Sequence, residues 1–183
     1  TFISKYDNTG ALIQTIEYVN QNNSYVVPQS IFVDNSSNIY VVTMDAVVLK
    51  FNSAGTLLWE NANTTYSSTS VEAATVDNSS IPNFIYYTGS FGSNAGVVKI
   101  NANTGASTWA TYLNPSGNNY SKAYDIAYNG GNIYITGLTN SSSGDAAYTV
   151  KLNSLGAIAY QYIGSSGISE TSLRLEVNTS GDA

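Results

Sequence analysis

Carboxylates and hydroxyls supply almost all of the acid–base chemistry open to this 183-residue chain, because the sequence contains no His and no Cys. Without His the chain lacks the commonest general base and the commonest metal ligand. Without Cys it has no disulfides and no thiolate metal sites. Glu72 and Asp125 could act as acid and base in glycoside hydrolysis if their separation were suitable. No motif for that activity accompanies them, so we expect no enzymatic activity.

The overall charge excludes a second class of function. Twelve acidic and six basic side chains give a net charge of -6, and only 10% of the residues are charged. Binding to nucleic acid depends on clustered Lys and Arg, so we expect no such partner. No apolar run approaches the roughly 18 residues of a membrane-spanning helix, and no signal peptide is visible. Because the chain begins at Thr1, we expect a processed protein or a segment of a longer one.

A repeated hairpin must position these side chains. An apolar strand reaches a lysine, Asp or Asn follows two residues later, and a turn closes on Gly before a second apolar strand. The repeat lysines, at intervals of 45 to 52 residues, are Lys5, Lys50, Lys99 and Lys151. The turns hold Asp7 with Gly10, Asn52 with Gly55, Asn101 with Gly105, and Asn153 with Gly156. Asx and Gly favour a tight reversal, because Gly adopts positive φ without a Cβ penalty.

A second hairpin precedes each lysine except the first. It spans residues 30–43, 73–89 and 124–137, and residues 172–183 begin it again and stop at its second strand. Each copy is a short strand, a polar turn and a strand with an Ile-Tyr or Tyr-Tyr core, which suits a pleated sheet. One complete unit therefore has four strands.

Four short antiparallel strands at this period are typical of a β-propeller blade. We predict an all-β propeller with about three complete and two partial blades. The predicted units are 1–24 (partial), 25–66, 67–117, 118–165 and 166–183 (partial). A two-sheet sandwich and a β-solenoid are the alternatives. Because four blades make a small ring, we expect a segment of a longer propeller, or copies that share a ring.

The units resemble the β-propeller repeats of secreted bacterial and archaeal proteins. The resemblance lies in residues 33–43 with 48–59, and in residues 126–137 with 149–160. Thr104, Gly105 and Trp109 are also similar to the blades of quinoprotein-type propellers. The resemblance implies a propeller and an extracellular or cell-surface location. It transfers no cofactor-binding set, so we expect no cofactor.

Propeller enzymes usually place their chemistry on the channel face, where the connections between strands differ from blade to blade. The residues expected there are Tyr25, Gln29, Met44, Asp45, Tyr66, Glu72, Phe91, Tyr120, Lys122, Asp125, Asp145, Glu170 and Arg174. The ligand-binding candidates among them are Tyr25, Asp45, Tyr66, Glu72, Tyr120, Asp125, Asp145 and Arg174. The alternative is that they are ordinary loop residues.

The repeated polar and aromatic residues favour structural roles. Asp34 and Asp77 suggest calcium, but Tyr128 occupies that place in the third copy and no calcium-loop motif is present, so we expect turn formation and no metal. We expect the repeat lysines to reach solvent or pair locally. Trp59 and Trp109 are expected to pack between blades, with Ile16 and Tyr160 as rough counterparts, and sugar stacking is the alternative.

These features favour a non-catalytic extracellular protein with a structural, self-assembling or adhesive role. Its expected partners are its own copies or other surface proteins. The abundance of Tyr and Asn supports an alternative, a glycan-binding lectin, and a hydrolase is the third possibility. Possible glycosylation sequons occur at Asn22, Asn35, Asn63, Asn78, Asn119, Asn140 and Asn178.

Overall fold

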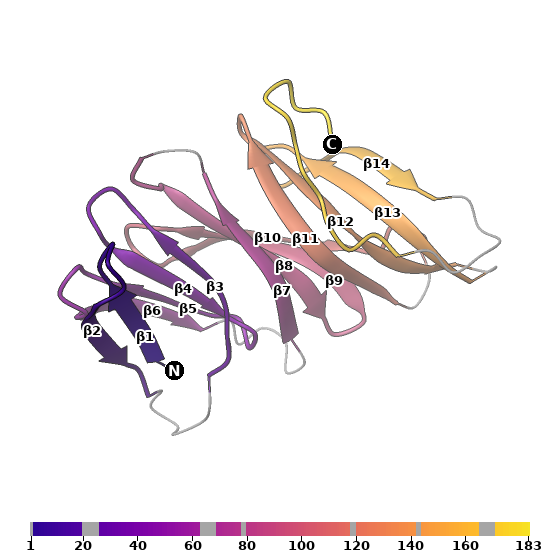
Figure 1. Ribbon diagram of the computed structural model, residues 1–183. Helices are drawn as coiled ribbons and strands as arrows, with labels where there is room; N and C mark the ends of the chain where they lie inside the picture. The colour runs from indigo at the N-terminus through magenta and orange to yellow at the C-terminus, as the bar shows by residue number, and fades with distance from the viewer. Residues whose placement is uncertain are drawn as a thin grey trace.

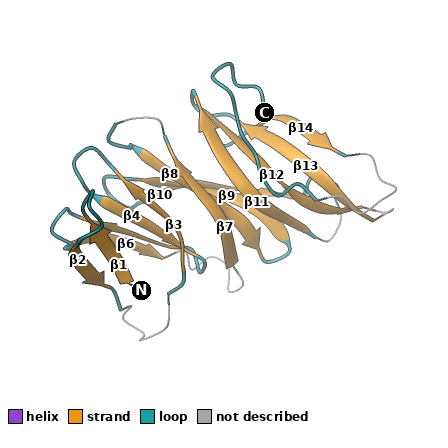
Figure 2. Cartoon of the chain, in the orientation of Figure 1, coloured by secondary structure: helices purple, strands orange, loops and turns teal. Residues whose placement is uncertain are grey.

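The computed structural model consists of strands and connecting loops (Figures 1 and 2). It describes residues 2–19, 26–62, 69–77, 80–117, 120–141, 144–164 and 171–183. Within these ranges no helix is long and apolar enough to cross a membrane.

Fourteen strands occur in the described ranges. They are β1 (Phe2–Tyr6), β2 (Leu12–Glu17), β3 (Pro28–Val33), β4 (Ile39–Thr43), β5 (Val47–Phe51), β6 (Leu57–Ala62), β7 (Thr69–Val76), β8 (Phe84–Phe91), β9 (Asn94–Asn101), β10 (Ser107–Leu113), β11 (Ser121–Asn129), β12 (Asn132–Ser141), β13 (Gly144–Leu152) and β14 (Ile158–Ile163).

The strands form four antiparallel sheets that follow one another along the chain. We name them the first sheet (β1–β2), the second (β3–β6), the third (β7–β10) and the fourth (β11–β14). Each complete sheet is a four-stranded meander in which every strand pairs with its neighbours in sequence. The sheets lie in a row, with the N-terminus at one end and the C-terminus at the other (Figure 1). The predicted all-β architecture of four-stranded antiparallel units is confirmed.

The apolar core lies between sheets, because the middle strands of each sheet are apolar on both faces. Every residue of β4 is buried, whereas the outer strand β6 alternates between exposed and half-buried residues. One buried cluster joins the first and second sheets, a second joins the second and third, and another joins the third and fourth. Each sheet therefore needs its neighbour to remove its apolar faces from water.

The polar turns of the repeat are closed by Asx side chains. In the turn after β5, the Asn52 side-chain oxygen accepts hydrogen bonds from the backbone N–H groups of Ala54 and Thr56, at 3.0 and 2.9 Å. Asp34 does the same for Ser36 and Asn38 in the turn after β3. The side chains of Asn38 and Tyr40 also donate to Asp34. Burial opposes ionisation of Asp34, but these hydrogen bonds outweigh burial and lower its pKa.

The C-terminal segment repeats the turn of Asp34. The Asn178 side chain accepts from the Asp182 N–H at 2.9 Å, and the Gly181 N–H donates to the Asn178 carbonyl. This turn packs on the fourth sheet, because Tyr134 donates its hydroxyl hydrogen to the Gly181 carbonyl at 2.9 Å. No strand is assigned among residues 171–183. The segment occupies the position at which a further unit would begin.

A contact that we name the clamp joins the second sheet to the third. The Lys50 Nζ and the Trp59 Nε1 both donate to the Ala102 carbonyl, at 3.1 and 3.3 Å. The Trp59 ring lies over Gly105, so close that a Cβ built on that glycine would be 2.8 Å from the ring.

The third and fourth sheets are joined by the same clamp. Lys99 and Trp109 donate to the Ser154 carbonyl at 3.3 and 3.2 Å. The Trp109 ring covers Gly156, whose built Cβ would be 2.9 Å from it. The expected packing of Trp59 and Trp109 between blades is thus confirmed.

Two expectations about the clamp need correction. The repeat lysines were expected to reach solvent or to pair locally; Lys50 and Lys99 are only 7% exposed and instead pair with backbone carbonyls of the next sheet. The residue paired with Lys5 is Gln14, as Trp59 is paired with Lys50, so Gln14 holds the register position of the tryptophans. Ile16, the expected rough counterpart, does pack between the first and second sheets, where a Cβ built on Gly55 would be 2.7 Å from it. Gln14 also donates to the next turn, at the Ala54 carbonyl.

A third expectation placed Tyr128 at the repeat position of Asp34 and was also wrong. Tyr128 pairs with Ile133 as Val33 pairs with Ile39. The residue after Tyr128 is Asn129, which therefore occupies the turn position. An Asx residue is thus present at this position in every described copy.

The clamp can be tested on two turn glycines that differ in their surroundings. Gly105 (φ +75°) lies under Trp59, whereas Gly10 (φ +86°) closes the corresponding turn of the first sheet, which is one residue shorter, and has no atom within 4 Å of its built Cβ. Gly10→Ala should cost only the left-handed backbone strain, about 1–2 kcal/mol. Gly105→Ala should cost about 1–3 kcal/mol more, because the ring must move. Urea unfolding of both variants measures the difference, and equal losses would show that the ring contact contributes nothing.

Candidate functional site

In the first strand of each complete sheet, which we call its innermost strand (β3, β7 and β11), one residue lies at a shift in the pairing with the next strand. Gln29, Glu72 and Tyr124 lie at the shifts between Pro28 and Ser30, Val71 and Ala73, and Ala123 and Asp125. These irregularities have the character of β-bulges, which redirect a side chain and are common beside functional sites. The same repeat position therefore turns away from the ladder in three consecutive sheets.

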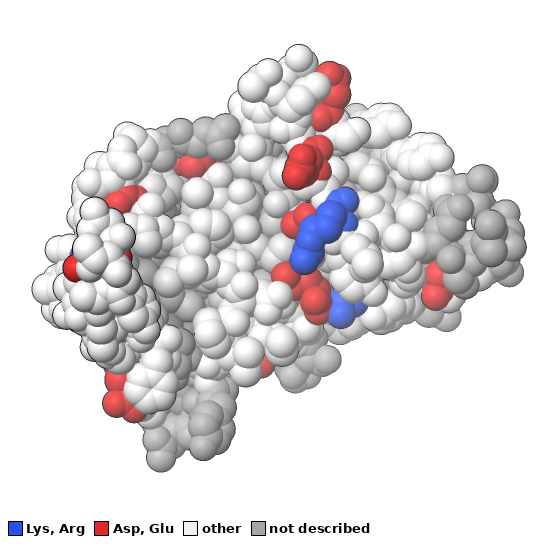
Figure 3. All heavy atoms as spheres, viewed as in Figure 1, with Lys and Arg blue, Asp and Glu red and all other residues white. Residues whose placement is uncertain are grey.

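The bulge residues line a shared pocket. Gln29, Glu72 and Tyr124 surround about 340 Å³ together with Leu173 and Arg174 from the C-terminal segment. Leu173 occupies the corresponding position of the last copy, five residues before Asn178, as Gln29 lies five residues before Asp34. On the face shown in Figure 3, most of the basic atoms gather with acidic atoms near the junction of the third and fourth sheets.

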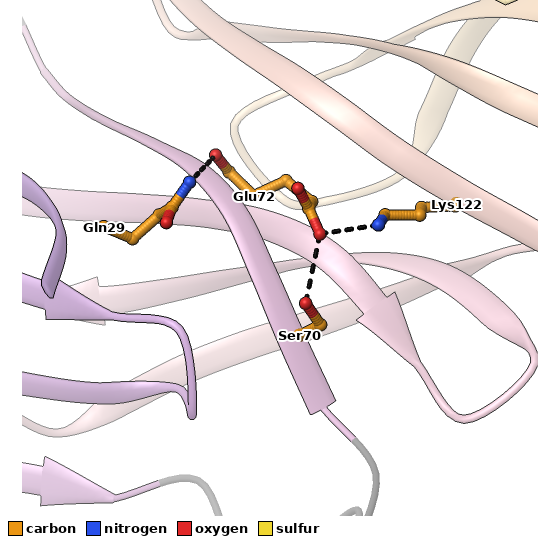
Figure 4. Close-up of polar contacts among 4 residues, drawn as sticks. All are labelled: Gln29, Ser70, Glu72 and Lys122. Atoms are coloured by element: carbon orange, nitrogen blue, oxygen red, sulfur yellow. Dashed lines mark hydrogen bonds and ion pairs between the residues drawn. The ribbon is translucent and has the colours of Figure 1, made fainter. Parts of the chain in front are cut away.

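Glu72 is the centre of a polar network across this junction (Figure 4). Its carboxylate accepts a hydrogen bond from the Ser70 hydroxyl at 3.0 Å and forms an ion pair with the Lys122 Nζ at 2.7 Å. Its backbone carbonyl accepts from the Gln29 Nε2 at 2.7 Å. The network thus links β3, β7 and β11.

Both side chains of the Glu72–Lys122 ion pair are largely buried. The side chains of Lys122 and Glu72 are 23% and 25% exposed, and the ammonium group also lies 5.1 Å from the centre of the Tyr124 ring. Burial alone would lower the pKa of Lys122, but the hydrogen bond and charge of Glu72 outweigh burial and raise it. Lys122 is therefore held in its charged form.

Asp125 ties the C-terminal segment to β11. Its two carboxylate oxygens accept from the backbone N–H groups of Ile126 and Leu175, both at 2.9 Å. Arg174 lies in that segment, and its guanidinium donates to the Leu173 carbonyl at 3.2 Å. Glu72 and Arg174 thus meet at one pocket, with Asp125 holding the backbone beside Arg174.

The remaining candidates lie away from this pocket. Asp45 is exposed in the turn between β4 and β5, Tyr120 is 41% exposed before β11, and Asp145 accepts from the Asn140 side chain in the β12–β13 hairpin. Phe91 was expected on the channel face, but it is fully buried against Tyr87 and Tyr112. Three further candidates lie outside the described residues: Tyr25, Tyr66 and Glu170.

Three lining or contact residues were missed by the sequence analysis. These are Ser70, Tyr124 and Leu173; Gln29 was expected on this face but was not ranked as a binding candidate. The fixed spacing of five residues before the Asx of each turn would have found Tyr124 and Leu173. No pattern distinguished Ser70.

The acidic residues of the repeat serve the turns. In the described part of the chain, no three His, Cys, Asp or Glu side chains come together to hold a metal ion. Asp34 closes its turn as described above, and Asp77 accepts from the backbone N–H groups of Asn83 and Phe84. The predicted turn-forming role of both aspartates is confirmed.

Three of the sequon asparagines fall in the described ranges. Asn35, Asn140 and Asn178 are exposed. The side chains of the latter two are hydrogen-bonded, to Asp145 and Asp182. The sequons outside the described residues are Asn22, Asn63, Asn78 and Asn119.

A double-mutant cycle tests whether the Glu72–Lys122 pair joins the sheets. Glu72→Gln, Lys122→Met and the double variant should give a coupling energy of about 1 kcal/mol, because the pair is three-quarters buried. Since the pKa of folded Lys122 is raised above its ordinary 10.5, the coupling should be full below that pH and be lost as pH rises through the raised value. Urea unfolding at several pH values measures it, and a coupling of zero at neutral pH would contradict the role.

Comparison with known proteins addresses the fold. No protein-family model matches the sequence, and no curated protein matches it. Among solved structures, BamB from Moraxella catarrhalis is 17% identical with a TM-score of 0.56, over 91% of this chain and 45% of that one.

Two other solved structures are similar at comparable levels. A europium-containing methanol dehydrogenase is 13% identical with a TM-score of 0.60, over 88% of this chain and 38% of that one. A protein of unknown function from Bacteroides caccae is 12% identical with a TM-score of 0.56, over 86% and 52%. The chain thus spans about half or less of the length of these structures.

BamB and the methanol dehydrogenase are β-propeller proteins. At these identities the likeness shows the fold alone. Together with the four-stranded antiparallel sheets, it confirms the predicted fold: the chain is built from β-propeller blades.

Proposed function

We propose that this chain is a non-catalytic, extracellular or surface-exposed propeller module that binds proteins, including its own copies. The supporting observation is the set of exposed apolar and aromatic side chains on the outer strand of the fourth sheet. Ile158, Tyr160 and Tyr162 on β14 are 52%, 57% and 56% exposed. Exposed apolar and aromatic side chains that gather on one face are typical of protein-binding surfaces.

The state of the acidic residues supports a non-catalytic role. Glu72 accepts a hydrogen bond from Ser70 and faces the Lys122 ammonium group at 2.7 Å, and Asp125 accepts two backbone hydrogen bonds. Both carboxylates are therefore engaged in contacts that join segments of the fold, which supports a structural role over proton transfer.

A second candidate function is glycan binding in the pocket lined by Gln29, Glu72 and Tyr124, which we call the channel-face pocket. Its lining offers an amide, a carboxylate, a phenol and a guanidinium, from Gln29, Glu72, Tyr124 and Arg174. Such groups can hydrogen-bond sugar hydroxyls, and Tyr124 can stack on a sugar ring. The pocket is separate from the β14 face, so the two functions can be tested independently.

Sedimentation velocity over a range of concentrations tests the leading proposal. We expect the weight-average sedimentation coefficient to rise with protein concentration, because the apolar face of β14 is buried on association. Glu72→Gln should leave this rise unchanged, since Glu72 lines the channel-face pocket and is not on β14. A monodisperse monomer at every concentration, together with specific signals on a glycan array that Glu72→Gln abolishes, would favour the lectin instead.

A further inference from the structure

Both ends of the row of sheets display an incomplete clamp. At every junction between sheets, a polar side chain on the outermost strand of one sheet donates to the turn of the next. These donors are Gln14, Trp59 and Trp109. Their equivalent on the fourth sheet is Tyr160, which pairs with Lys151 as Trp109 pairs with Lys99.

The fourth sheet has side chains of the kind that form this contact at the other junctions. Lys151, Tyr160 and Tyr162 line a recess of about 390 Å³ with Tyr134, Thr149 and the chain end. The Lys151 Nζ lies 5.1 Å from the centre of the Tyr134 ring, as the Lys50 Nζ lies 5.0 Å from the Tyr40 ring in the complete clamp. The donors and rings are therefore in place, and no turn like that of Asn153–Ala157 lines the recess among the described residues.

The first sheet offers the missing turn. Asp7 accepts from the backbone N–H of Ala11 at 2.9 Å, and the Gly10 N–H donates to the Asp7 carbonyl, as in the clamped turn from Asn153 to Ala157. Gly10 has φ +86°, close to the +81° of clamped Gly156. Unlike Gly156, it has nothing within 4 Å of its built Cβ.

We propose that the turn of residues 7–11 in one copy of this chain seats in the recess of a second copy, covering Gly10 with Tyr160 and Tyr162. The proposal deepens the proposed function, on which it rests, by naming the partner and the contact. It repeats the contact that already joins the sheets within the chain and needs no hydrogen-bonded strand ladder. Because the two surfaces differ, the contact is head-to-tail and produces rings or linear arrays.

The register specifies a disulfide that would trap this contact. In the clamp of the third and fourth sheets, a Cβ built on Gly156 would be 2.9 Å from the Thr111 hydroxyl oxygen. Tyr162 lies two residues after Tyr160, as Thr111 lies two after Trp109. Cys at positions 10 and 162 should therefore meet at a separation suited to a disulfide, whose Cβ atoms lie about 3.5–4.5 Å apart. The native chain has no Cys, so no other thiol competes.

The test mixes two single variants, Gly10→Cys and Tyr162→Cys, under mild oxidation. We expect the mixed disulfide dimer to form at least about ten times faster than in a control mixture of Gly117→Cys and Tyr162→Cys, because the clamp holds the thiols at a high local concentration. Gly117 is a matched control, with φ +72° and nothing within 4 Å of its built Cβ. Equal rates in the two mixtures would overturn the proposal.

A second measurement requires no cysteine. Tyr160→Asp should abolish the concentration-dependent rise in sedimentation coefficient, whereas Ile81→Asp, at a 46% exposed site in the connection between β7 and β8, should leave it unchanged. If the chain associates and both variants behave alike, the head-to-tail contact is wrong and the proposed function survives. If the unmodified chain stays monomeric at every concentration, both the head-to-tail contact and the proposed self-association are wrong.

Discussion

The second, third and fourth sheets depend on one contact with their neighbours, in which a tryptophan ring covers a turn glycine. Only glycine permits this approach, because a Cβ on Gly105 or Gly156 would be within 3 Å of the ring. The same glycine supplies the positive φ that closes the turn. The ring nitrogen and a lysine then both donate hydrogen bonds to one backbone carbonyl of that turn. Turn geometry, apolar burial and hydrogen bonding are thus satisfied together, and each sheet is completed by the next.

Much of this arrangement could be predicted from the sequence, because each repeat marks its strands with a lysine, an Asx and a glycine. The partners of the lysines could not. Ala102 and Ser154 accept through backbone carbonyls, which no side-chain pattern reveals. The match of Gln14 to the tryptophans could be found from the sequence, because Gln14 lies nine residues after Lys5 as Trp59 lies nine after Lys50, and the strand pairing agrees with it.

The candidate site, too, could be predicted from the sequence only in part. Glu72, Asp125 and Arg174 could be proposed because their charges interrupt a mainly uncharged chain. Their grouping depends on a bulge in each innermost strand, which directs Gln29, Glu72 and Tyr124 toward one pocket. A bulge adds one residue to a strand without a distinctive residue type. Asp45 and Asp145 are equally charged, but they lie in β-hairpins that do not reach that pocket.

Native-state hydrogen exchange tests most directly whether each sheet is completed by the next. In Trp109→Ala, the backbone N–H groups of Gly156 and Ala157, which belong to the fourth sheet, should exchange at least about tenfold faster, equivalent to about 1.4 kcal/mol of lost protection. The equivalent groups of Gly55 and Thr56 in the second sheet should be unaffected. Faster exchange confined to the third sheet, with Gly156 and Ala157 unchanged, would contradict the account.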